Sequence, residues 1–133
     1  MEHMKAGIAA EQQQKFDQAI VEFKKAAELD PTLPDAFISL GQANMELGNY
    51  GSAIAPLKRA VELKGDSVSA HQLLGYSLLA QGYAAEAIPH LQRAGDTAAM
   101  GIAQIQTGQL MEAVSNLQNA LFFRASMFLS KSP

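Results

Sequence analysis

Histidine is the side chain in this sequence best suited to metal binding or proton transfer, and the chain has three: His3, His71 and His90. Two histidines of one helix bind a metal together when they lie one turn apart, and no two of these are so spaced. Packing or surface positions are therefore favoured for all three. The absence of cysteine excludes disulfides and thiolate chemistry. The glycines form no phosphate-binding loop, and the sequence shows no recognisable pair of a nucleophile and its catalytic base. We expect no catalytic residue, no metal site and no cofactor, and thus a protein that is not an enzyme.

Composition narrows the class of protein further. The chain has 133 residues, of which 48% are hydrophobic and 17% charged, with a formal net charge of −3. This balance is typical of a folded domain. There is no basic surplus to attract nucleic acid. No apolar run approaches the roughly 20 residues that span a bilayer, so no membrane insertion is expected. A cytoplasmic location is favoured, and a periplasmic one after removal of a signal peptide stays open.

Small residues recur at a spacing of 34 residues. Three series keep this spacing in register: Gly7, Gly41 and Gly75; Ala19, Ala53 and Ala87; Ala26, Ala60 and Ala94. Periods of this length indicate stacked supersecondary units. Within each unit the apolar residues follow the period of two helices, and small residues let these helices approach to about 8–10 Å.

The pattern resembles the tetratricopeptide repeat, a helix–turn–helix unit of about 34 residues. The resemblance covers about residues 1–120, although the family's fourth position holds His3 and His71 here and the chain has no tryptophan. It implies an all-α fold, a right-handed α-solenoid of stacked antiparallel helix pairs, with about four repeats and about eight helices. We expect one domain over 1–133, with repeats at about 1–33, 34–67, 68–95 and 96–121 and a C-terminal helix extension at 122–133.

The fourth repeat unit begins eight residues earlier than the 34-residue spacing predicts. After Ala94 the next glycine of the series should follow 14 intervening residues, but Gly101 follows six. Gly95 is suited to end a helix in a left-handed conformation, and Asp96 or Thr97 is suited to cap the next helix. We therefore expect the solenoid to continue through a shortened link. The alternative is that the register fails here and the last segment packs differently.

The C-terminal segment is apolar where a terminal solenoid helix usually has a polar outer face. It either packs back onto the fourth unit or meets another chain, as a homodimer or as part of a longer repeat protein. The residues of this predicted self-association surface are Leu121, Phe122, Phe123, Phe128 and Leu129.

The resemblance also implies where a partner binds, because the first helices of this family line a concave groove. We therefore expect a non-catalytic protein–protein interaction module, a scaffold that binds a peptide or helix. The predicted groove comprises Asp35, Ile38, Gln42, Met45, Glu46, Gln72, Tyr76, Leu79, Ile102, Ile105 and Gln106. For Ile102 and Ile105, the alternative is that they fill the core beside the shortened link.

One subgroup of the family clamps acidic C-termini of chaperones with basic residues in this groove. The corresponding positions here hold Met4, Ile8, Ser39, Ser69 and Leu73. None of these side chains is basic, so an acidic C-terminus is not the expected ligand.

Overall fold

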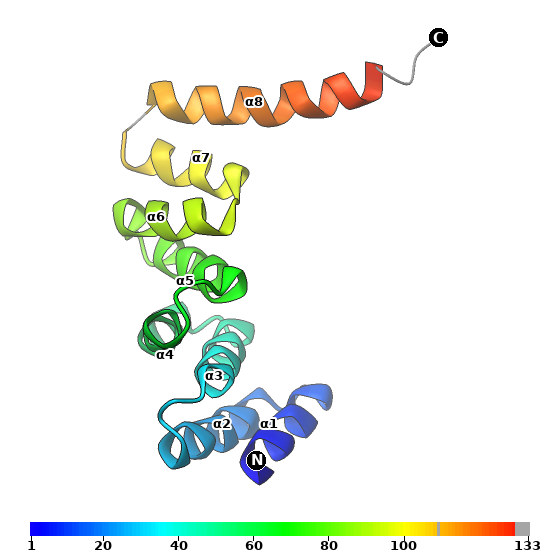
Figure 1. Cartoon of the computed structure of the whole chain (residues 1–133), viewed down its shortest axis with the longest axis vertical. Coiled ribbons are helices and arrows are strands. Elements are labelled where there is room, and N and C mark those ends of the chain that lie inside the picture. The colour runs from blue at the N-terminus through cyan, green and yellow to red at the C-terminus, as the bar shows by residue number, and fades with distance from the viewer. Residues whose placement is uncertain (109, 130–133) are drawn as a thin grey trace.

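A computed structural model describes residues 1–108 and 110–129, with the backbone alone for 110–113. These residues form eight α-helices and no strand. The helices are α1 (Glu2–Gln12), α2 (Phe16–Leu29), α3 (Pro34–Glu46), α4 (Tyr50–Leu63), α5 (Val68–Ala80), α6 (Ala84–Ala94), α7 (Thr97–Gln106) and α8 (Leu110–Leu129). Each packs chiefly against the helices before and after it, which gives the elongated stack of Figure 1. The predicted all-α solenoid of helix pairs is confirmed.

The spacing of small residues has the predicted packing role. Gly75 of α5 lies against Leu91 of α6, and a Cβ atom at Gly75 would come within 2.5 Å of Leu91 Cδ2. Gly41 of α3 faces Leu57 of α4 in the same way, again at 2.5 Å. The glycine of each first helix therefore receives a bulky residue of the second helix, and this contact repeats along the stack.

The shortened link takes the form that the sequence predicts. Gly95 ends α6 with a left-handed φ of 71°, and the Asp96 carboxylate accepts a hydrogen bond of 3.0 Å from the Ala99 N–H at the start of α7. Compared with α4 (14 residues) and α5 (13 residues), α6 and α7 are each three residues shorter, at 11 and 10. The connection has two residues instead of four. These three reductions together account for the eight missing residues.

The core continues across this link. Ala99 and Ala103 of α7 belong to the same buried cluster as Leu74 and Leu78 of α5. Gly101 of α7 faces Leu117 of α8, as the glycines of the earlier pairs face their partners. The register therefore resumes after the link, and the alternative in which the last segment packs differently is not supported.

The last helix is also the longest, at 20 residues. Residues 122–129 continue α8 without a break, and its C-terminal half projects beyond the rest of the stack (Figure 1). Residues 130–133 of the predicted extension lie outside the described residues. Within the described chain, none of the helices combines the length and apolar character needed to cross a membrane.

Candidate partner-binding groove

The first helix of each pair supplies most of the predicted groove. On α3, Asp35, Gln42 and Glu46 are exposed, while Ile38 and Met45 are half-buried. This mixture leaves polar groups in solvent and apolar surface within reach of a partner. This pattern is expected of a helix with one face that the rest of the chain does not cover.

A hollow of about 390 Å³ lies where α3, α4, α5 and α7 come together. We call it the groove hollow. Its lining residues are Met45, Tyr50, Tyr76, Leu79, Ala80 and Gln106. Four of these belong to the predicted groove: Met45, Tyr76, Leu79 and Gln106. Its size and mainly apolar lining suit a few side chains of a bound segment.

The structure thus separates the predicted residues into two groups. The remaining seven do not line the groove hollow: Asp35, Ile38, Gln42, Glu46, Gln72, Ile102 and Ile105. Tyr50 lines it but was not predicted, because it stands at the start of a second helix, α4. The family pattern points to first helices and gave no signal for it.

Two predicted groove residues also hold the shortened link. The Tyr76 hydroxyl donates a hydrogen bond to the Asp96 carboxylate, and Gln72 Nε2 donates to the Tyr76 hydroxyl at 3.0 Å. Burial acts to raise the pKa of Asp96, but hydrogen bonds from Tyr76, the Ala99 N–H and Gln72 together lower it. The same bond to Asp96, followed by burial, raises the pKa of Tyr76. Tyr76 is therefore fixed in place before any partner arrives.

Ile102 and Ile105 do not fill the core. Ile102 is 48% exposed and Ile105 is 46% exposed on α7. The core of α7 is supplied instead by Ala99 and Ala103. Both isoleucines are thus open to a partner, as the groove prediction requires.

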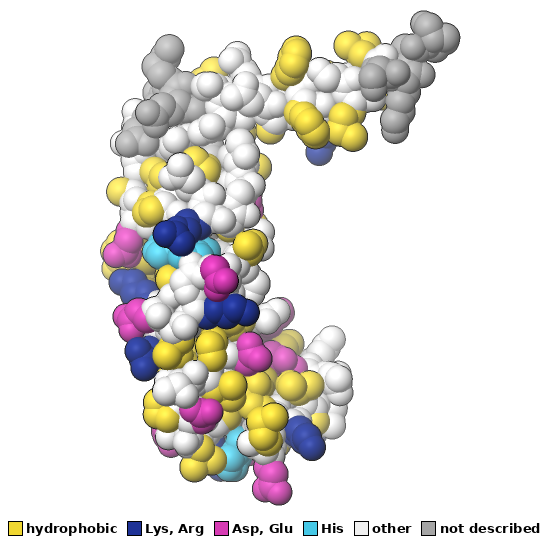
Figure 2. Space-filling view, viewed as in Figure 1, with side chains coloured by type: hydrophobic (Ala, Val, Ile, Leu, Met, Phe, Trp, Pro, Cys, Tyr) yellow, Lys and Arg dark blue, Asp and Glu magenta, His cyan; other side chains and the backbone are white. Residues whose placement is uncertain are grey.

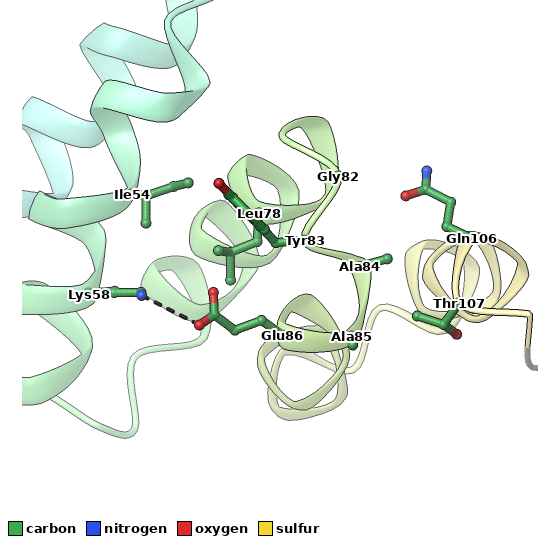
Figure 3. A pocket seen from close by; sticks show the side chains of 10 residues that line it. All are labelled: Ile54, Lys58, Leu78, Gly82, Tyr83, Ala84, Ala85, Glu86, Gln106 and Thr107. Carbon is green, nitrogen blue, oxygen red and sulfur yellow. Dashed lines mark ion pairs between the residues drawn. The ribbon is translucent and has the colours of Figure 1, made fainter.

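A second, larger hollow of about 660 Å³ lies beside the α5–α6 turn (Figure 3). Ile54 and Lys58 of α4 lie at one end of this turn hollow, and Gln106 and Thr107 at the other. Lys58 Nζ lies 3.5 Å from a carboxylate oxygen of Glu86, so the charges there offset each other. Gln106 lines both hollows, which makes the groove hollow and the turn hollow neighbours.

The structure brings His71 and His90 together, which their spacing did not predict. His71 Nε2 lies 2.8 Å from the Gly65 carbonyl oxygen, so it carries the donated proton. In the neutral ring, Nδ1 of His71 then accepts a hydrogen bond from His90 Nδ1 at 3.0 Å. Burial, and then the neighbouring His71, lower the pKa of His90. Within the described residues, no three His, Cys, Asp or Glu side chains cluster as a metal site.

The predicted self-association residues are all strongly exposed on the projecting half of α8. Phe122 and Phe128 are each 74% exposed, and Leu121, Phe123 and Leu129 are at least 64% exposed. Apolar side chains stand on both edges of the projecting helix in Figure 2. Of the two alternatives, the one in which this segment packs back onto the fourth unit is therefore not supported in the described residues.

Two family models match the chain. One, described as a TPR repeat, matches residues 11–48, and the other, a tetratricopeptide repeat, matches residues 38–99. The chain belongs to the tetratricopeptide repeat family. Repeats of this family are typically non-catalytic and bind proteins or peptides, so the chain is a protein–protein interaction module of scaffold type.

Solved structures share the architecture. A crystal structure of MamA is 27% identical with a TM-score of 0.80, covering 84% of this chain and 70% of that one. A MamA mutant is 30% identical with a TM-score of 0.65, covering 71% of this chain and 69% of that one. MamA from Desulfovibrio magneticus RS-1 is 19% identical with a TM-score of 0.83, covering 90% and 72%, and shows the fold alone. No curated protein sequence matches the chain significantly.

Proposed function

We propose that the protein binds a peptide or helical segment of a partner protein in the groove, without catalysis. The observation that carries the proposal is the groove hollow, in which Met45 and Leu79 from two first helices present apolar surface around the fixed ring of Tyr76. Burying such surface drives association, and the exposed Ile102 and Ile105 extend it along α7.

The test compares proteins captured by the immobilised chain and by the variant Met45→Ala/Leu79→Ala, identified by mass spectrometry. Both substitutions remove apolar surface of the groove hollow and leave the Tyr76–Asp96 bond in place. The matched control is Val21→Ala/Leu29→Ala, which removes two exposed apolar side chains of α2. We expect the groove variant to lose specific partners that the control retains. An identical set of partners for all three proteins would refute the groove assignment.

A second function, self-association through α8, rests on an independent observation. A helix that is apolar on several sides is normally covered by protein. The projecting half of α8 shows such sides with Phe123 and Met127 on one and Leu121 and Phe128 on another, all exposed. We propose that this segment forms a dimer, or joins a further part of a longer repeat protein.

Light scattering tests this second function. We expect a dimer for the chain and a monomer for Phe123→Glu/Phe128→Glu, with unchanged helical signal. A monomer in both cases would remove self-association through α8.

A further inference from the structure

Charge is divided unevenly between the first and second helices of the pairs. Among the described helices, α3, α5 and α7 contain no Lys or Arg, and α1 contains one, Lys5. The basic residues of the second helices are Lys24, Lys25, Lys58, Arg59, Arg93 and Arg124. The helices that form most of the predicted groove are therefore almost without cationic side chains.

Three of the five second-helix carboxylates whose side chains are described have cationic partners nearby, and the other two, Asp17 and Glu28, form no ion pair. Glu86 pairs with Lys58 at 3.5 Å, and Glu62 pairs with Arg59 at 3.1 Å. Glu22 lies 3.9 Å from Lys25 Nζ. Most of the described second-helix carboxylates are therefore compensated by a nearby cation.

Carboxylates of the first helices are not balanced in this way. Glu46 is exposed on α3 and directly follows Met45, which lines the groove hollow. Glu11 is half-buried near the C-terminal end of α1. Burial, and then the like charge of Glu46, raise the pKa of Glu11. In the described part of the chain, neither Glu11 nor Glu46 forms an ion pair. Two carboxylates of the first helices thus have no cationic partner among the described residues, and one of them, Glu46, is next to a residue that lines the groove hollow.

We propose that the groove selects a cationic apolar segment, which places aliphatic or aromatic side chains in the groove hollow and Lys or Arg side chains against Glu11 and Glu46. This inference rests on the proposed function and names the chemistry of its partner. An acidic segment would bring a third negative charge to the pair, whereas a basic one relieves the existing repulsion. Selectivity then comes from charge, and most of the affinity comes from the apolar contact.

The experiment uses the full chain and three synthetic amphipathic helical peptides with the same leucine face. Their polar faces consist of lysine, glutamine or glutamate, and binding is followed by fluorescence anisotropy at low and high salt. We expect the lysine peptide to bind best, the glutamine peptide less well and the glutamate peptide least. The differences should shrink at high salt because exposed charges are screened.

Two variants locate the selectivity. Glu11→Gln/Glu46→Gln should weaken lysine-peptide binding about tenfold and leave the glutamine peptide unchanged. The control Glu28→Gln/Glu62→Gln alters net charge equally through exposed residues of α2 and α4, and should change binding less than about twofold.

The outcomes separate the two proposals. Equal binding of all three peptides, lost in Met45→Ala/Leu79→Ala, would overturn the charge inference and leave the proposed function standing. Lysine-peptide binding that survives Glu11→Gln/Glu46→Gln would also overturn the charge inference. If none of the peptides binds and light scattering shows that copies of the chain associate instead, both the inference and the groove function are overturned.

Discussion

Replacing Asp96 by alanine tests how the shortened link is held. The change removes two main interactions of one carboxylate, the cap on the Ala99 N–H and the hydrogen bond from Tyr76. The carboxylate also accepts a hydrogen bond from Gln72 Nε2, which at 3.4 Å is long and adds little. Loss of an aspartate N-cap costs about 1 kcal/mol. A hydrogen bond to a charged group contributes roughly 1.5–3 kcal/mol, and the lower end applies because Asp96 is only partly buried. We therefore expect Asp96→Ala to lower the free energy of unfolding by about 2.5 kcal/mol.

Three further variants divide this loss between its two sources. Ser67 caps α5 through a hydrogen bond of 3.2 Å from the Ala70 N–H, so Ser67→Ala measures a cap alone, at about 1 kcal/mol. Tyr76→Phe removes the bond to Asp96 and should cost about 1.5 kcal/mol. Asp96→Asn keeps a good capping residue and loses the charge, so it should cost less than Asp96→Ala.

The assay is urea unfolding followed by circular dichroism, with free energies obtained by linear extrapolation. A double-mutant cycle of Tyr76→Phe and Asp96→Ala should give a coupling energy of about 1 kcal/mol or more. Hydrogen exchange should show α7 and α8 loosening before α1 to α5, because each helix is held chiefly by its neighbours in the stack. A cost of Asp96→Ala no greater than that of Ser67→Ala, together with no coupling in the cycle, would show that the Tyr76–Asp96 bond does not hold the link.

Three other predictions use the same unfolding measurement. Gly75→Ala should destabilise the protein by about 1–2 kcal/mol, because overpacking against Leu91 outweighs the roughly 1 kcal/mol of helix propensity gained. Gly101→Ala should change the stability little, because its Cβ would lie 3.1 Å from Leu117 Cγ. Equal losses of stability in the two variants would contradict the packing argument. Gly95→Ala should cost about 1 kcal/mol because Gly95 has a φ of 71°, and an unchanged midpoint would mean that the link relaxes. Because the pKa of His90 is lowered in the folded chain, the unfolded chain takes up a proton first as pH falls. The contribution of neutral His90 to the free energy of unfolding is therefore full above the unfolded-state pKa of about 6.5 and is lost as pH falls below it. His90→Gln should flatten this pH dependence, and an unchanged pH profile would show that His90 is not its source.

Much of the fold could be predicted from the sequence because its determinants are local or periodic. The recurrence of Gly41 and Gly75 fixes which faces of two helices meet, since only small residues permit the close approach. The shortened link could also be predicted, because its determinants are local: Gly95 ends α6 through its own backbone conformation, and Asp96 caps α7 three residues further along the chain. Four residues that line the groove hollow followed from the family pattern alone.

The tertiary structure decided what depends on contacts between helices. His71 and His90 are 19 residues apart, and Tyr76 and Asp96 are 20 apart. Such pairs meet only through the crossing of particular helices, which spacing along one helix does not specify. For the same reason the sequence left Ile102 and Ile105 undecided between core and groove, and the C-terminal segment undecided between packing back onto the fourth unit and meeting another chain. Periodicity determines that a face is apolar, whereas the helices packed beside it determine whether that face is covered.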